Sequence, residues 1–175
     1  KLWVNGTKVN NVPQSAAFDF PFRYTVRDAA NSGDWSKLEN ASNAPLINSR
    51  QFRQYAVTFV ENHDTQMRSA SEPLDPIKKD TLAANAYLLA MPGTPCVFYR
   101  HWLDHKQAIK AMIEVRRAAG IVNTSVPTIV SREPKQYVVS VAGTKGTLLC
   151  VLGDEAENYA PDATKYVKVL SGQHC

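Results

Sequence analysis

The chain contains 175 residues, of which 44% are hydrophobic and 21% are charged, and its net charge is +4 at pH 7. This globular composition excludes a disordered tail, a coiled coil and a collagen-like fibre. At about 150 residues per domain, the length corresponds to one domain and part of a second.

The basic residues are scattered along the sequence. Lys78 with Lys79 and Arg116 with Arg117 are the only adjacent pairs among 20 basic residues. A surface that binds nucleic acid needs positive charge clustered on one face, so we expect no nucleic-acid partner. No apolar run reaches the about 18 residues of a membrane-spanning helix, so we expect no membrane partner either.

The first predicted elements lie before residue 35. Residues 1–14 are polar and contain Asn-Gly and Asn-Asn, which predicts a loop. Residues 15–20 are mainly apolar with one carboxylate, Asp19, which favours a buried strand. One or two helical turns are expected over residues 24–30, and residues 31–34 have the composition of a turn.

A second strand and helix follow. Residues 55–60 form a β-branched and aromatic run, the pattern of a strand buried on both faces in a parallel sheet. Asp75 and Pro76 predict an N-cap followed by proline in the first helical turn. Apolar spacings of three and four predict a helix over residues 77–91, and residues 92–95 contain the prolines and glycine that stop it.

The third predicted unit ends at Gly120. Residues 96–99 read as a strand in which Cys96 is a buried thiol, and residues 105–119 read as a helix that Gly120 closes. Strands and helices therefore alternate three times up to this glycine. This order predicts the α/β fold class.

The pattern changes after residue 120. Short runs with partial alternation are separated by turn residues, which predicts an all-β module that begins near residue 124. Its expected strands cover residues 128–132, 136–141, 147–152 and 166–170.

Four polar residues, Glu61, Asn62, His63 and Asp64, directly follow the strand at 55–60. Functional residues of parallel α/β sheets gather just past the carboxyl ends of strands. Four such residues would be costly to bury in a core, so we expect them to project into a cleft. The alternative is a turn-forming and helix-capping cluster, because Asn and Asp favour turns.

Other candidates for chemistry are weaker. Asp19 and residues 99–101 also lie at strand ends. His101 and His105 are four residues apart and could share a metal on a continuous helix, but a capping or surface role fits a strand-to-helix junction better. The three cysteines show no zinc-type spacing, and phosphate-loop and nucleophile-elbow motifs are absent from the sequence.

Three segments resemble the α-amylase superfamily of glycoside hydrolases. Residues 59–65, FVENHDT, are similar to the fourth signature region of that superfamily. Residues 86–99, AYLLAMPGTPCVFY, resemble the passage from helix seven to strand eight of its barrel, and residues 15–21, SAAFDFP, resemble strand six. The resemblance covers residues 14–120 well, and the β module fits domain C of the family more loosely.

The resemblance implies a fold and an activity. The chain would be the C-terminal portion of a (β/α)8 TIM barrel, residues 1–122, followed by the start of a β-sandwich domain C, residues 123–175. The parent enzyme would cleave α-1,4-glucosidic bonds in starch-like glucans with retention of configuration. Retaining glycosidases use two carboxylates about 5–5.5 Å apart as nucleophile and acid/base.

The resemblance also implies a role for each residue of the polar cluster. Asp64 would be the third carboxylate, which grips sugar hydroxyls and stabilises the distorted ring of the transition state. His63 would donate to the same sugar, and Asn62 would support the site from behind. Glu61 occupies a position where family members carry Asp or Glu.

The remaining catalytic groups are expected outside the chain. If residues 16–20 are strand six, the nucleophile and the acid/base precede Lys1, and the fragment alone is expected to be inactive. The expected partners are an α-glucan and the N-terminal part of the barrel. No cofactor or metal is expected within the chain, although calcium is plausible in the full-length parent, and family habit implies an extracellular or periplasmic location.

Two alternative functions stay open at this point. The first is transglycosylation by a member of the same superfamily, because the polar cluster does not separate water from a sugar as acceptor. The second is a non-enzymatic carbohydrate-binding or interaction protein derived from a degenerate barrel. In that protein Trp3, Trp35 and Trp102 could stack on sugar rings.

Overall fold

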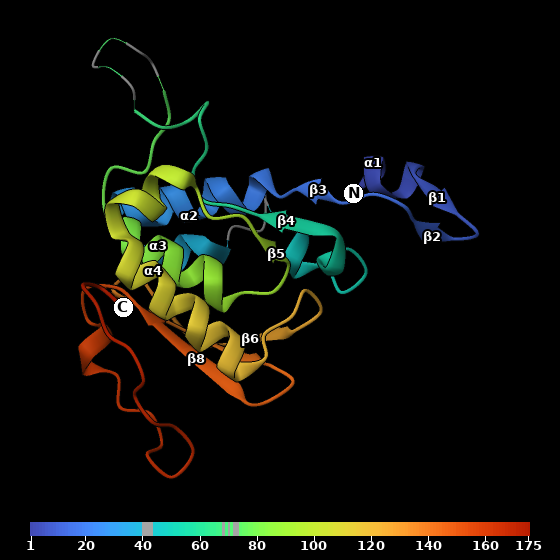
Figure 1. Cartoon of the computed structure of the whole chain (residues 1–175). Helices are drawn as coiled ribbons and strands as arrows, with labels where there is room; N and C mark the ends of the chain where they lie inside the picture. Colours follow the sequence, from blue (N-terminus) through green and yellow to red (C-terminus); the bar gives the residue numbers. More distant parts are fainter. Residues whose placement is uncertain (40–43, 68, 70, 72–73) are drawn as a thin grey trace.

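The computed structural model describes residues 1–39, 44–67, 69, 71 and 74–175. In this part of the chain, two three-stranded sheets and three longer helices surround a main apolar core, and a two-stranded hairpin lies apart from it (Figure 1). No helix of the described part combines the length and the apolar character that crossing a membrane requires.

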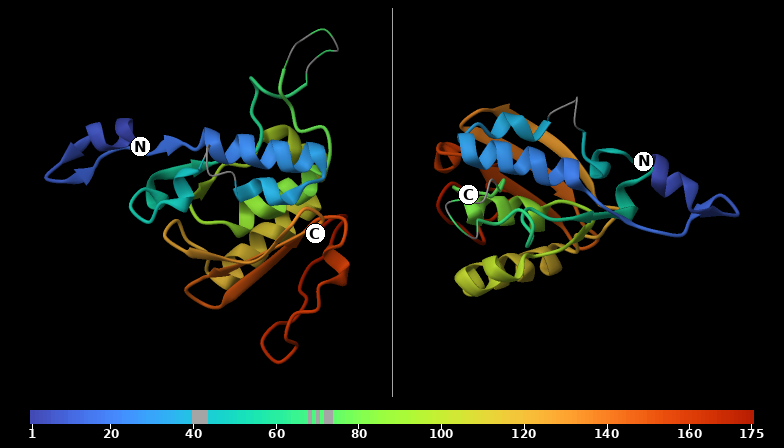
Figure 2. Two further views of the ribbon diagram at one scale, coloured as in Figure 1. Left: turned by 180° about the vertical axis from the view of Figure 1, so that it is seen from behind. Right: turned by 90° about the horizontal axis from the view of Figure 1, so that it is seen from above.

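An N-terminal arm projects from the body of the molecule (Figure 2). It contains α1 (Leu2–Gly6) and an antiparallel hairpin of β1 (Lys8–Val9) and β2 (Val12–Pro13). Asn10 and Asn11 have φ values of 50° and 64°, the left-handed conformation that two-residue hairpin turns require. The prediction of a loop over residues 1–14 is therefore wrong, because this Asn-Asn pair closes a hairpin.

The parallel strands are β3 (Ala17–Phe18), β4 (Ala56–Thr58) and β5 (Thr94–Pro95), in the order β3-β4-β5. The predicted parallel pairing is confirmed. The first two strands are shorter than predicted, and β5 lies before the predicted strand 96–99, whose residues form no strand. The strand predicted to reach residue 20 ends at Phe18 because Asp19 caps the next helix, accepting from the Phe22 N–H at 3.3 Å.

Three helices connect and cover these strands. They are α2 (Phe20–Ser32), α3 (Thr81–Ala90) and α4 (Tyr99–Ala119). The first and last end at glycines in the left-handed conformation, Gly33 and Gly120. The sequence predicts this end for Gly120, whereas α2 is longer than the one or two turns predicted over residues 24–30.

Two helix starts differ from the prediction. Helix α3 begins at Thr81 rather than at residue 77, because the carboxylate of Asp75 pairs with arginines of α2 instead of capping. Helix α4 begins at Tyr99, within the predicted strand 96–99, and its backbone breaks at His105 (φ −133°). Cys96 is exposed rather than buried, because the chain leaves the sheet at Pro95 and turns into α4.

The antiparallel sheet consists of β6 (Val126–Glu133), β7 (Gln136–Ala142) and β8 (Thr147–Leu152), which confirms three of the four predicted strands. Residues 166–170 form no strand: Val167 and Val169 are exposed and no described strand pairs with them. Figure 1 shows this sheet beneath α3 and α4. Short 3-10 helices occupy Trp35–Glu39, Leu46–Asn48, Arg53–Tyr55 and Ala156–Asn158.

The main core joins the helices to the antiparallel sheet. The ring of Tyr87 on α3 stacks on Phe22 of α2, with centroids 5.5 Å apart, and meets Tyr137 of β7 edge-on at 6.0 Å. Helix α3 also contacts β8. The carboxyl end of the parallel sheet is thus fixed on a core to which α2, α3 and β7 all contribute.

Candidate active site

The polar segment at residues 61–64 lies past the carboxyl end of β4, where the sequence places it. Phe59, Val60 and Glu61 are buried, whereas the side chains of His63 and Asp64 are 82% and 75% exposed. The chain therefore turns from the core into solvent within three residues. His63 and Asp64 are the two side chains of the segment that are free to meet a ligand.

Asn62 holds the turn that presents these two side chains. Its Oδ1 accepts hydrogen bonds from the backbone N–H of Asp64 at 2.9 Å and of Thr65 at 3.0 Å. This is an Asx turn, so the turn-forming alternative describes Asn62 well. His63 Nε2 lies 3.3 Å from Asp64 Oδ1, which places an imidazole and a carboxylate side by side at the surface.

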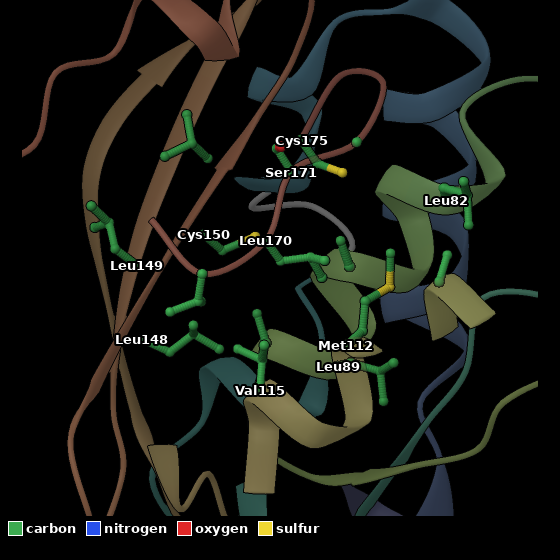
Figure 3. A pocket seen from close by; sticks show the side chains of 16 residues that line it. Leu82, Leu89, Met112, Val115, Leu148, Leu149, Cys150, Leu170, Ser171 and Cys175 are labelled. Carbon is green, nitrogen blue, oxygen red and sulfur yellow. The ribbon is translucent and has the colours of Figure 1, made fainter. Parts of the chain in front are cut away.

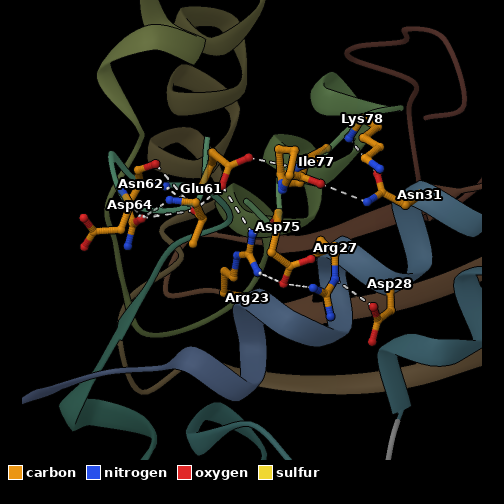
Figure 4. Close-up of polar contacts among 12 residues, drawn as sticks. Arg23, Arg27, Asp28, Asn31, Glu61, Asn62, Asp64, Asp75, Ile77 and Lys78 are labelled. Atoms are coloured by element: carbon orange, nitrogen blue, oxygen red, sulfur yellow. Dashed lines mark hydrogen bonds and ion pairs between the residues drawn. The ribbon is translucent and has the colours of Figure 1, made fainter. Parts of the chain in front are cut away.

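Glu61 is a structural member of the cluster (Figure 4). Its Oε2 accepts from the N–H of Ile77 at 2.8 Å, and its Oε1 lies 3.4 Å from Arg23 Nη2 and accepts from the hydroxyl of Thr65. Only 3% of the residue is exposed. A carboxylate engaged in this way is not offered to a ligand.

Arg23 is the residue that sequence reasoning missed. It lies on α2 with no exposed surface, and its Nη1 is 2.8 Å from Asp75 Oδ2. Arg27, one turn later, pairs with the same carboxylate. The signal available in the sequence was an arginine next to Phe22 on the apolar face of a helix, where a charge requires a partner.

The two weaker strand-end candidates are structural. The carboxylate of Asp19 is fully buried and accepts from the N–H groups of Phe22 and Ile47, and burial raises its pKa. His101 is buried, and its Nδ1 lies 3.2 Å from Asn85 Nδ2. Burial lowers the pKa of His101, so the neutral imidazole is favoured there.

The metal alternative concerns histidine side chains, and the sugar-stacking alternative concerns three tryptophans. No group of three or more His, Cys, Asp or Glu side chains is arranged to hold a metal ion in that part of the chain. Trp35 is completely buried and cannot stack on a sugar. Trp3 is exposed on the short α1, and Trp102 is half-buried with Lys106 Nζ 5.9 Å from its ring centroid.

An apolar pocket lies elsewhere, between α3, α4, β8 and the C-terminal segment (Figure 3). Its volume is about 140 Å³, and none of its lining residues belongs to the segment 61–65. Cys150 faces it from β8, and burial raises the pKa of this thiol to about 12. The lining is mainly aliphatic, so the pocket offers few polar groups to bond a polyol.

Comparison with known proteins identifies relatives, although no family model matches the sequence. The chain is 32% identical over 164 residues to probable alpha-amylase 2 of Arabidopsis thaliana, an alignment that covers 90% of this chain. It is 31% identical over 147 residues to a glucan 1,4-alpha-maltotetraohydrolase of Stutzerimonas stutzeri, covering 81% of this chain. The chain resembles the C-terminal part of an α-amylase.

Solved structures of amylase-type enzymes share the fold. A cyclomaltodextrin glucanotransferase, CldA, matches 86% of the chain with a TM-score of 0.63 at 16% identity. AmyP in complex with maltose matches 85% with a TM-score of 0.59 at 14% identity. The chain spans 37% of the Arabidopsis alpha-amylase and 26% of the maltotetraohydrolase, and therefore corresponds to part of such an enzyme.

Proposed function

We propose that the chain supplies the last three strand–helix units of a (β/α)8 barrel, residues 1–122, and the start of domain C, residues 123–175, of a retaining α-amylase-type glycosidase. Support comes from the parallel order β3-β4-β5 followed by an antiparallel sheet, together with relatives named as amylases and a maltotetraohydrolase. The substrate is an α-1,4-glucan.

The observation that carries the proposal is the exposed pair His63 and Asp64 at the carboxyl end of β4. In this proposal Asp64 accepts hydrogen bonds from two sugar hydroxyls, and these bonds strengthen as the ring flattens toward the oxocarbenium-like transition state. His63 donates to the same sugar, and Asn62 fixes the turn. Asparagine, histidine and aspartate suit a neutral polyol better than a phosphorylated substrate.

The nucleophile and the acid/base belong to the part of the enzyme outside this chain. Asp19 and Glu61, the other carboxylates near the carboxyl ends of the strands, are buried and hydrogen-bonded within the protein. Neither can serve as one of two carboxylates that face a glycosidic bond. Calcium, if the enzyme uses it, is held by that other part as well.

The preceding strand of the proposed barrel would fit at the free edge of the parallel sheet, beside β3. Among the described strands β3 has one neighbour, β4, and its free edge carries Phe18, which is 58% exposed. Phe20 beside it is exposed too, and both rings pack edge-on against Phe59. In the proposal the preceding barrel strand pairs with β3 and covers these rings.

The test is Asp64→Asn in the complete enzyme that contains this chain, assayed on soluble starch. The amide keeps the shape but loses the charge, so we expect kcat to fall by several orders of magnitude while the thermal midpoint is unchanged. Asp154→Asn is the control, because this carboxylate is also solvent-accessible, with 53% of its side chain exposed, but follows β8. Ordinary turnover in the Asp64 variant refutes the role.

A further inference from the structure

The segment that carries Asn62, His63 and Asp64 is tied to the protein at both of its ends. Glu61 lies at its start, and residues 75–78 lie at its end (Figure 4). Arg23 of α2 contacts both ends: Nη2 lies 3.4 Å from Glu61 Oε1, and Nη1 lies 2.8 Å from Asp75 Oδ2. We call Arg23, Glu61 and Asp75 the arginine clamp.

Further contacts reinforce the clamp. Arg27 pairs with Asp75, and Arg23 Nη2 donates to the Asp75 carbonyl oxygen. Glu61 Oε2 accepts from the N–H of Ile77 at 2.8 Å, so the two ends of the segment also bond directly. Asn31 Nδ2 donates to the Pro76 carbonyl at 2.9 Å. Two arginines thus face two carboxylates across the ends of one segment.

A continuous set of hydrogen bonds connects the clamp to the exposed pair. The Thr65 hydroxyl donates to Glu61 Oε1 and accepts from the N–H of Asn62 at 3.2 Å. Asn62 Oδ1 in turn accepts from the N–H of Asp64 at 2.9 Å. Arg23 is thus connected to the backbone of Asp64 by direct contacts alone. Removal of the guanidinium can therefore displace the turn.

Because Arg23 and Glu61 are buried, the loss of their ionic partners would be costly. Arg23 has no exposed surface, and its Nε has no hydrogen-bond partner within the described part of the chain. A buried guanidinium that loses its carboxylates is strongly disfavoured, and so is a buried carboxylate that loses its arginine. An arrangement that separates Arg23 from Glu61 would therefore leave two buried charges without their ionic partner.

We infer that Arg23, acting through Glu61 and Asp75, is the positioning residue for the substrate-binding pair His63 and Asp64. This inference rests on the proposed function of that pair. Arg23 touches no substrate; it fixes the place and the angle at which the turn meets the sugar. Small misplacements of binding groups are costly in catalysis, so the effect falls on kcat more than on KM.

The first experiment measures amide hydrogen exchange in the complete enzyme and needs no activity. In Arg23→Met the amides of Asp64 and Thr65 are expected to exchange at least about tenfold faster relative to Leu88 of α3, because a charge-assisted hydrogen bond is lost. Arg116→Met is the matched control: Arg116 is also a buried arginine, but it bonds carbonyls at the end of α3 and just after it.

A milder variant covers the case in which Arg23→Met fails to fold. The Asp75 side chain is 52% exposed, so Asp75→Asn should be tolerated and should speed exchange of the Asp64 and Thr65 amides in the same direction. Asp75→Glu, which keeps the charge, should restore most of the protection. Equal changes at Asp64, Thr65 and Leu88 in the Arg23 and Asp75 variants would show that the clamp is only a general stabiliser, and would overturn the inference.

Kinetics supply the second measurement. Arg23→Met and Asp75→Asn should lower kcat on soluble starch by about tenfold or more, with less than about a threefold change in KM. A rise in KM alone would overturn the inference. The proposed function is tested separately: retained activity in Asp64→Asn rejects that function, while the exchange result still decides whether the clamp orders the turn.

Discussion

His101 is a buried histidine near the start of α4, and its environment fixes its charge state. Its ring meets Phe98 edge-on with centroids 5.4 Å apart, and Asn85 lies within hydrogen-bond distance. Burial lowers the pKa of His101, His105 lowers it further, and Glu61 and Asp104 act in the opposite direction. The charged imidazole is therefore disfavoured in the folded state.

This environment predicts how stability depends on pH. An unfolded chain takes up a proton on His101 near the ordinary pKa of 6.5, whereas the folded protein does so only at lower pH. The stability contributed by neutral His101 is thus present above pH 6.5 and is lost as the pH falls through the lowered folded-state pKa. We expect His101→Gln to flatten this loss in thermal unfolding of the complete enzyme.

The control for this prediction is His63→Gln, because the side chain of His63 is largely exposed. That variant should keep the pH dependence of the unmodified protein. Parallel stability curves for the unmodified protein and His101→Gln between pH 7.5 and about 5 would contradict the assignment.

At the scale of elements, the end of α4 depends on a glycine that allows two segments to approach. Gly120 has a φ of 70°, and a Cβ built there would lie 2.3 Å from Thr144 Oγ1 and 2.9 Å from the backbone N of Lys145. The N–H groups of residues 144 and 145 donate to the carbonyls of Gly120 and Ala119. The helix end is thus bonded to the turn between β7 and β8.

Gly120→Ala should therefore destabilise the protein. The left-handed conformation alone costs about 1–2 kcal/mol for a non-glycine residue, and the backbone contact adds to it. Gly146→Ala is the matched control, since a Cβ there meets no atom within 4 Å. Thermal unfolding of both variants in the complete enzyme checks this, and equal midpoints would show that the turn moves aside without cost.

Hydrophobic periodicity and turn-forming residues predict the elements that depend on residues close together in the sequence. The β4 strand, the glycine end of α4 and three antiparallel strands follow from local pattern. The predicted cap at Asp75 was wrong because its partner, Arg23, is 52 residues away in sequence. The same separation hid the clamp, whereas the exposed His63 and Asp64 could be found from their place after a buried strand.

At the scale of the whole molecule, the parallel sheet has two free edges among the described strands, at β3 and β5. Free edges with exposed aromatic side chains favour association between chains. We expect the isolated 175-residue chain to be insoluble or molten, and inactive on soluble starch because our proposal places the catalytic carboxylate pair outside it.

Circular dichroism during heating checks this prediction. A chain with an incomplete core should lose its signal gradually, without a cooperative transition. A sharp transition would show that the described core suffices for folding. Activity that disappears in Asp64→Asn of the isolated chain would show that a carboxylate pair within these residues completes the site, and would overturn the proposed division of the barrel.

Arg116 of α4 bonds to the end of α3, and these hydrogen bonds can form only after both helices have been synthesised. Its guanidinium donates to the carbonyls of Leu89 and Met91 at 2.8 and 2.6 Å, and to that of Gly93 at 3.1 Å. These acceptors precede their donor by 23 to 27 residues in the chain. During synthesis on the ribosome, these three carbonyls therefore cannot receive the Arg116 guanidinium until most of α4 has emerged.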